Sequence, residues 1–174
     1  MNEIPQILEP KEKVIYYGKP EYAPYIVAAI FGSLIVAVII GIFIGAYLKS
    51  IMWAIVVGII IIILGIILRN MAYTRTHYAI TNKRAIIQSG IIGRDFKSID
   101  YDKMQNVSVD VGILGVIFKV GSIKIFTGEI ETVSTGRHGS RMQPKYDRFT
   151  YITSPYEVLK KIQTNLSTRK EELA

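Results

Sequence analysis

The sequence predicts a membrane protein in which a hairpin of two transmembrane helices carries a mainly β cytosolic domain of about seven strands, closed by a C-terminal helix. Three observations predict this class. Two long uncharged apolar stretches lie in the first half of the chain. Short β-branched and aromatic runs, broken by Gly, Asn and Asp, follow them. A helix start signal then appears close to the end of the chain.

The two apolar stretches are residues 24–48, with 25 consecutive uncharged residues, and residues 51–68, with 18. At about 1.5 Å per residue they would be roughly 37 and 27 Å long, against a hydrocarbon core of about 30 Å. The alternative is a helical hairpin buried in a soluble core, but the rest of the chain is too small to cover it. A cleaved signal peptide is not expected, because the polar residues 1–23 precede the first span and a second span follows at once.

The turn between the spans contains only Lys49 and Ser50, so both flanks must lie on one face of the membrane. Basic residues gather on the flanks, and the positive-inside bias places such flanks in the cytoplasm. These basic residues are Lys11, Lys13, Lys19, Arg69, Arg75, Lys83 and Arg84. We therefore expect a multi-pass protein of the cell membrane with both termini in the cytoplasm.

The net charge lies in the part that follows the spans. Residues 69–174 hold 17 Lys or Arg and 10 Asp or Glu, whereas residues 1–68 hold four of each. A basic domain beneath a bilayer is attracted to anionic lipid headgroups by about 1 kcal/mol per Lys or Arg near the surface. Nucleic acid is the other common partner of a basic domain. For a domain held at a membrane we expect the lipid bilayer rather than nucleic acid.

The part after the spans divides into a linker at 69–75, a β domain at 76–168 and a tail at 169–174. Within the β domain, the alternation of Val107, Val109 and Val111 marks a strand face that is turned to a core. The predicted strands are residues 77–81, 84–89, 95–101, 106–111, 122–127, 130–134 and 148–152.

Two connecting segments of the domain have a distinct composition. Residues 112–121 are apolar and flanked by glycines. They fit either a core plug or short helical turn, or a tip that touches the membrane. Residues 135–147 are polar and contain Gly and Pro, so we expect a mobile loop there.

The C-terminal helix has a well-specified start. Ser154, Pro155 and Glu157 fit an N-cap residue, the first helical position and the acid of a capping box. An apolar stripe follows at spacings of three and four, which can lie across the open end of a small barrel. Its members are Tyr156, Leu159, Ile162 and Leu166. The chain after Ser167 is expected to fray.

Several motifs occur in a characteristic order. They are a Tyr-Ala-Ile-Thr strand at 78–81, a basic turn, a strand that ends in Ser-Gly at 89–90, and the segments 99–107 and 114–125. With the stretch EKVIYYGKP at 12–20, they resemble the bacterial pleckstrin-homology-like family found as a membrane-flanked domain. The resemblance implies a seven-stranded pleckstrin-homology-like barrel capped by a C-terminal helix. It implies little about biochemistry, because a fold does not define a function.

The sequence contains no catalytic or metal-binding pattern. It has two histidines, His77 and His138, and no cysteine, and it lacks the G-x-S-x-G, H-E-x-x-H, Walker and G-x-G-x-x-G motifs. Asp100 and Asp102 form a carboxylate pair at a strand end, where acids more often cap a turn or solubilise an edge. We therefore expect no enzyme, no cofactor and no metal site, with His77 at the rim of the barrel.

The candidate binding residues are Lys83 and Arg84, in the turn between the first two predicted strands, together with Arg75 just before them. In lipid-binding pleckstrin-homology domains, basic residues of the matching hairpin hold inositol phosphates, so the resemblance implies lipid headgroup contact at these positions. The second strand continues with no further basic residue at 85–88. Diffuse attraction to anionic lipid is therefore favoured over a specific pocket, and an ordinary solvated turn is the alternative.

Small residues recur every four positions in the first span: Ala29, Ser33, Ala37, Gly41 and Gly45. Such a stripe lets two helices approach closely, either inside the hairpin or across a homodimer seam. No ionisable residue lies inside either span, which argues against an ion or proton pathway.

The expected function is a membrane-anchored, non-catalytic binding or assembly module, whose basic domain lies near anionic lipid. The membrane anchor would raise the effective concentration of the domain for partners in the same plane. The alternative is a scaffold for a membrane protein partner or for a second copy of the chain, without lipid recognition.

Overall fold

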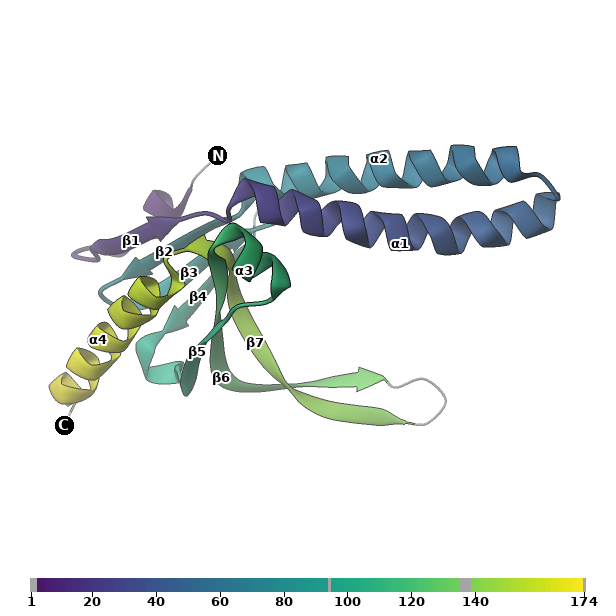
Figure 1. The fold of residues 1–174 in the computed structure, drawn as a ribbon. Helices are drawn as coiled ribbons and strands as arrows, with labels where there is room; N and C mark the ends of the chain where they lie inside the picture. Colours follow the sequence, from purple (N-terminus) through teal and green to yellow (C-terminus); the bar gives the residue numbers. More distant parts are fainter. Residues whose placement is uncertain (1–2, 94, 135–138, 174) are drawn as a thin grey trace.

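A computed structural model of the chain describes residues 3–93, 95–134 and 139–173. Figure 1 shows two long helices that extend together from one side of a mainly β domain. A C-terminal helix, α4 (Pro155–Leu173), runs along the domain in the direction away from them. The predicted order of a helical hairpin, a β domain and a final helix is confirmed.

The long helices are α1 (Tyr22–Leu48) and α2 (Ile51–Arg75), and both are long and apolar enough to cross a membrane. In the most apolar part of α1 11% of the residues are buried, and in that of α2 none are. A helix in the core of a soluble protein would be mostly buried, so these two expose apolar surface that needs another cover. The segment 69–75, predicted as a linker, continues α2 as a helix.

In the order of the chain, the helical hairpin lies between two strands that are direct neighbours in one sheet. β1 (Val14–Gly18) precedes α1, and β2 (His77–Thr81) follows α2 directly. The two strands pair antiparallel, with Gly18 opposite Tyr78. β1 was not predicted, since residues 1–23 were expected only as a segment that precedes the spans. The chain therefore enters and leaves the hairpin at adjacent positions of the β domain.

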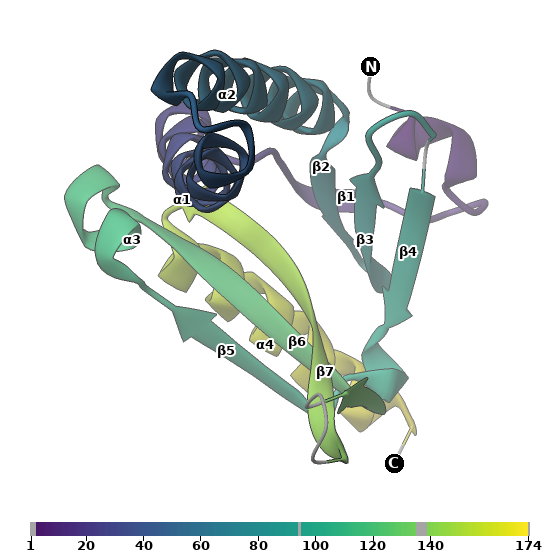
Figure 2. The ribbon, with the colours of Figure 1, turned by 90° about the vertical axis from the view of Figure 1, so that its right-hand side faces the viewer.

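In the part of the chain that the structure describes, seven strands form two separate antiparallel sheets, in the orders β1-β2-β3-β4 and β5-β6-β7. The remaining strands are β3 (Arg84–Ser89), β4 (Asp95–Asp100), β5 (Asn106–Asp110), β6 (Val120–Ser134) and β7 (Ser140–Thr153). Figure 2, seen along the long helices, shows the two sheets diverging below them. Among the described residues no strand ladder joins the two sheets, so the predicted seven strands are present but the barrel that they form is not closed.

The main core lies between the two sheets and α4. Tyr78 of β2 and Phe149 of β7 are buried at its centre, with their rings stacked at 4.7 Å. The Tyr78 hydroxyl also accepts a hydrogen bond from the Thr150 N–H at 3.0 Å, which links the two sheets where no ladder does. A smaller core covers the outer face of the first sheet, where Ile4 of the short helix η1 (Ile4–Ile7) packs on Ala79 and Ile86.

α4 closes the core, although not with the whole predicted stripe. Val158 and Ile162 are fully buried, and Leu166 packs against the cluster. Tyr156 is 68% exposed, so its assignment to the apolar stripe is wrong and Val158 takes that place. The helix begins at Pro155 as predicted, but it continues past Ser167 to Leu173.

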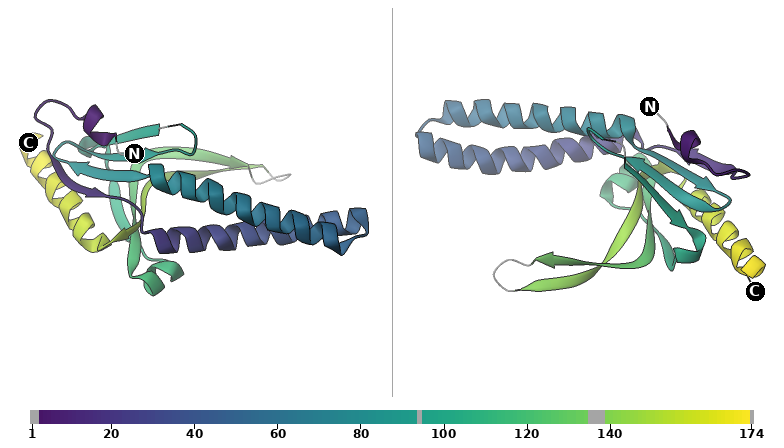
Figure 3. Two further views of the ribbon diagram at one scale, coloured as in Figure 1. Left: turned by 90° about the horizontal axis from the view of Figure 1, so that it is seen from above. Right: turned by 180° about the vertical axis from the view of Figure 1, so that it is seen from behind.

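β6 and β7 continue beyond the core as a two-stranded arm, which extends in the same general direction as the long helices but is separated from them (Figures 1 and 3). The predicted strands 122–127 and 130–134 are one strand with a bulge between Phe126 and Ile130. Gly128 has φ +85° there, and a Cβ at this position would stand 2.6 Å from the Gln105 amide nitrogen. The predicted loop is wrong for residues 140–147, which belong to β7, whereas 135–138 with His138 lie outside the described residues.

Candidate functional site

The predicted basic turn lies at the end of β2 that is remote from the long helices. β2 begins at His77, directly after α2, and the chain turns at Asn82 and Lys83. At about 3.3 Å per residue, the five residues of β2 place this turn roughly 16 Å from the end of α2. Figure 1 shows β2 running away from the helices. The short separation in sequence suggested that the turn would lie beside the second span. The structure instead places it at the far end of β2.

Lys83 and Arg84 both contact acidic residues of the segment before β1. The Lys83 ammonium lies 2.8 Å from a Glu9 carboxylate oxygen, and both side chains are about half exposed. Arg84 donates to both carboxylate oxygens of Glu12, at 3.0 and 2.9 Å, and to the Ile7 carbonyl oxygen at 3.0 Å. Lipid contact by Lys83 and Arg84 stays a prediction, but both charges already have partners within the chain.

Glu12 is the centre of this network. Its side chain is fully buried, while that of Arg84 is 16% exposed. The carboxylate also accepts hydrogen bonds from the Thr81 hydroxyl at 2.7 Å and from the Glu9 N–H at 2.8 Å. Burial raises the pKa of Glu12, but the hydrogen bonds from Arg84, Glu9 and Thr81 outweigh burial and hold that pKa below its usual range. Glu12 thus fastens the N-terminal segment to the β2–β3 turn as a charged group.

Arg75, the third predicted lipid contact, ends α2 and reaches the β3–β4 connection. Its guanidinium donates to the carbonyl oxygens of Ile92 and, at 3.4 Å, of Gly93. Its contact with lipid also stays a prediction. These bonds attach the end of α2 to the first sheet.

The other polar residues singled out in the sequence do not form a site. His77 is half-buried and stacks on the Tyr17 ring at 5.9 Å, and burial lowers its pKa. Asp100 pairs with Lys103 at 3.5 Å and Asp102 lies 3.8 Å from Arg169, both at the surface. Over the ranges that the structure describes, no cluster of three acidic or histidine side chains could hold a metal ion.

The stripe of small residues faces α2. Ala29, Ser33, Ala37 and Gly41 are buried. A Cβ at Gly65 would stand only 2.7 Å from the Ser33 Cβ, and one at Gly45 would stand 3.3 Å from the Ala54 Cβ. In this chain the stripe therefore brings the two helices of the hairpin together, and a homodimer seam remains an untested alternative.

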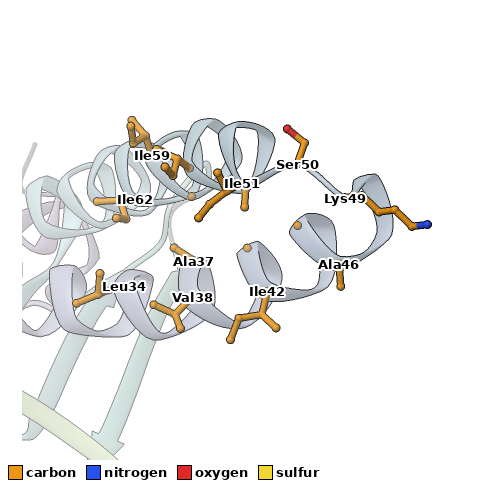
Figure 4. Close-up of a pocket in the computed structure, with 15 residues that line it drawn as sticks. Leu34, Ala37, Val38, Ile42, Ala46, Lys49, Ser50, Ile51, Ile59 and Ile62 are labelled. Atoms are coloured by element: carbon orange, nitrogen blue, oxygen red, sulfur yellow. The ribbon is translucent and has the colours of Figure 1, made fainter.

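In the half of the hairpin nearest its turn, residues of both helices line an apolar groove of about 600 Å³. Figure 4 shows Leu34, Ile42 and Ile62 along this groove, with Lys49 and Ser50 at its end. The lining is apolar apart from the turn, so it offers few polar contacts to a water-soluble ligand.

The segment 112–121 contains a short helix, α3 (Ile113–Phe118), beside the start of α1 (Figure 1). The short helical turn among the predicted alternatives is confirmed, but a core plug is wrong. Ile113, Val116 and Ile117 are 82%, 71% and 64% exposed. Contact between these side chains and the membrane stays a prediction.

The sequence reasoning missed Glu9 and Glu12, the residues that fix the basic turn. Each lies more than 70 residues from its partner in the turn, so neither helical nor strand spacing could reveal the pairs. A weaker signal exists, because both acids lie in the mostly polar segment that precedes β1.

A comparison with family models agrees with this architecture. The family model described as Bacterial PH domain matches residues 22–167, which include both long helices. One solved structure that resembles the chain is a DUF1696 family protein with a pleckstrin-homology domain from Shewanella loihica PV-4. It is 18% identical, the match covers 54% of this chain and 73% of that one, and the TM-score is 0.36. No curated protein matches the sequence.

Proposed function

Because this chain belongs to the Bacterial PH domain family, we propose that it is a membrane-anchored, non-catalytic module for binding or assembly. The family is a non-catalytic kind of domain, which supports a role in binding or assembly. One observation carries the membrane part of the proposal: a helical hairpin with exposed apolar surface interrupts the β domain between β1 and β2. A bilayer is the cover that such surface needs.

The aromatic residues at the base of the hairpin support this placement. Tyr22 and Tyr25 of α1 both contact Tyr73 of α2, with ring centroids 4.9 and 5.7 Å apart. Tyr and Trp are typical of the membrane–water interface. Together with the excess of Lys and Arg on the same side, this favours a β domain and both termini in the cytoplasm.

The β domain contacts the base of the hairpin at several points. The Glu21 N–H donates to the Tyr151 carbonyl oxygen at 2.7 Å, and the Thr153 hydroxyl donates to the Glu21 carboxylate at 3.2 Å. Tyr25 also packs edge-on against Tyr151. With β1 and β2 at its two ends, the hairpin would hold the domain in one orientation. A partner in the membrane plane would then meet a defined face of the domain.

Extraction of membranes tests the anchor. We expect the full chain to stay in the membrane pellet after a wash with alkaline carbonate, because the exposed apolar area of the hairpin cannot be left in water. Detergent should release it. Release by carbonate alone would show that the chain is only attached to the membrane surface.

A second function, that of a scaffold, is favoured by the β6–β7 arm. Ile130 and Met142 on the arm are 65% and 75% exposed. A two-stranded hairpin is marginally stable by itself, and its free edges can pair with a partner strand. As the alternative to lipid contact, we propose that a membrane protein partner or a second copy of the chain binds at this arm. Because the chain has no cysteine, Met142→Cys allows cross-linking at this arm alone. Cross-linked adducts at this position, in a protein that does not bind anionic vesicles, would favour the scaffold.

A further inference from the structure

The open side of the barrel leaves a hollow where the β domain meets the helical hairpin. Two adjoining cavities of about 310 and 300 Å³ lie there. Both are lined by Tyr25 of α1, Arg69 of α2, and Arg148 and Thr150 of β7. We call these four residues with their two cavities the junction site.

The junction site carries net positive charge from its two arginines. The Arg69 guanidinium lies over the Tyr25 ring, 5.2 Å from its centroid. Arg148 is exposed, and within the described ranges no carboxylate pairs with it. Two aspartates also line the cavities, but each is matched by a lysine. Asp147 pairs with Lys97 and Asp110 with Lys124, at 2.8 and 2.7 Å.

An apolar groove leads from the junction site along the helical hairpin. It has a volume of about 360 Å³ and shares Ala28 and Arg69 with the smaller cavity. Gly32, Leu64 and Gly65 are among the residues that line it. A Cβ at Gly32 would meet no atom within 4 Å, so the groove is open at this position. The combined space is therefore cationic at one end and apolar along the rest.

We propose that the junction site and this groove bind one anionic phospholipid. The phosphodiester lies between Arg69 and Arg148, and an acyl chain follows the groove past Gly32. Guanidinium groups bind phosphate oxygens through paired, charge-assisted hydrogen bonds, and basic pockets at the cytoplasmic ends of transmembrane helices suit lipid headgroups. The depth agrees, because Arg69 follows directly on the apolar run that ends at Leu68. This inference rests on the proposed insertion of the hairpin in a membrane.

The test compares two arginines of the same strand in the full chain. The purified protein is freed of lipid in mild detergent and mixed with dioleoylphosphatidylglycerol or dioleoylphosphatidylcholine, and bound lipid is counted by native mass spectrometry. We expect tighter binding of the anionic lipid, and Arg148→Gln should weaken it about fivefold. The control is Arg141→Gln, an equal loss of charge on the exposed arm of β7, which should leave binding unchanged. Equal binding by the two variants would overturn the proposal.

A second arm distinguishes a lipid from free phosphate. Gly32→Leu should fill the groove and reduce binding of the anionic lipid while both arginines remain. Glycerol 3-phosphate, which has the phosphate without acyl chains, should not compete at concentrations at which the lipid saturates. Effective competition, or full lipid binding by Gly32→Leu, would contradict a phospholipid site. If Arg148→Gln binds normally while the chain resists carbonate, this inference fails and the membrane anchor stands; release by carbonate would remove both.

Discussion

Replacing residues 19–77 by Asn-Gly is expected to convert the protein from a membrane-bound form to a soluble, folded domain. Gly18 and Tyr78 are directly opposite in the β1–β2 ladder, so a two-residue turn can connect them as an ordinary β-hairpin. No member of the main core cluster or of the smaller core lies within the replaced segment. The variant loses the whole exposed apolar surface of α1 and α2 and keeps the core.

The measurement is fractionation followed by thermal unfolding of the soluble material. We expect the shortened chain in the supernatant without detergent, with one cooperative unfolding transition. A truncated fragment that begins at residue 70 is the matched comparison. It lacks β1, Ile4 and Glu12, so it should be less stable than the shortened chain. A shortened chain that aggregates, or that unfolds no more cooperatively than the fragment, would show that the hairpin is needed for the β fold.

The second large effect is expected at Glu12. Glu12→Gln removes the carboxylate that neutralises Arg84 in a nearly buried environment. Breaking a buried ion pair by removing one partner costs about 3 to 5 kcal/mol. Arg84 keeps its bond to the Ile7 carbonyl and a weaker pairing with Glu9 at 3.8 Å. We therefore expect a loss of about 2 to 4 kcal/mol in the free energy of unfolding of the shortened soluble domain.

Lys83→Ala is the matched control for Glu12→Gln. It breaks the neighbouring pair with Glu9, in which both side chains are about half exposed, and such pairs contribute about 0 to 1 kcal/mol. The energies of Glu12→Gln and Arg84→Gln should not add in the double variant, because the two groups interact directly. Equal effects of Glu12→Gln and Lys83→Ala in chemical denaturation would contradict the structural role given to Arg84.

The ion pair between Glu12 and Arg84 also predicts a dependence of stability on pH. The pKa of Glu12 is lowered in the folded protein, so its carboxylate contributes stability that is present above its ordinary value of 4.5. This contribution is lost as the pH falls through the lower pKa of the folded state. The difference in unfolding free energy between the parent domain and Glu12→Gln should therefore be constant near neutral pH and shrink below about pH 4.5. A difference that widens in acid would contradict the sign of this shift.

Elements with a strong local pattern could be predicted from the sequence. The bounds of β2 and β3 agree with the predicted 77–81 and 84–89, because β-branched runs and a polar turn define them locally. The start of α4 at Pro155 follows from its preference for the first helical turn. β1 was missed even though its Val-Ile-Tyr-Tyr run has strand character. Its partner β2 lies beyond a helical hairpin, and local patterns carry no information on such pairing.

The β6–β7 arm and the junction site could not be predicted from the sequence for a similar reason. A single glycine with positive φ turns a predicted break in β6 into a bulge within a long strand. Arg69 and Arg148 come together only because the sheets remain open next to the helices, and 78 residues separate them in the sequence. For the basic turn the error was of a different kind, because the sequence predicted a binding site but did not reveal the ion pairs that the structure shows within the chain. Its charges were visible in the sequence, but their partners Glu9 and Glu12 were not recognised.

The measurement that tests the membrane arrangement most directly is labelling of single cysteines in intact cells. The chain has no cysteine, so two variants each give a single reporter: Ser50→Cys in the turn between α1 and α2, and Gln163→Cys on the exposed face of α4. With a maleimide that cannot cross the membrane, we expect Ser50→Cys to be labelled from outside and Gln163→Cys only after lysis. Labelling of Gln163→Cys in intact cells would contradict a hairpin that crosses the membrane and holds the β domain in the cytoplasm.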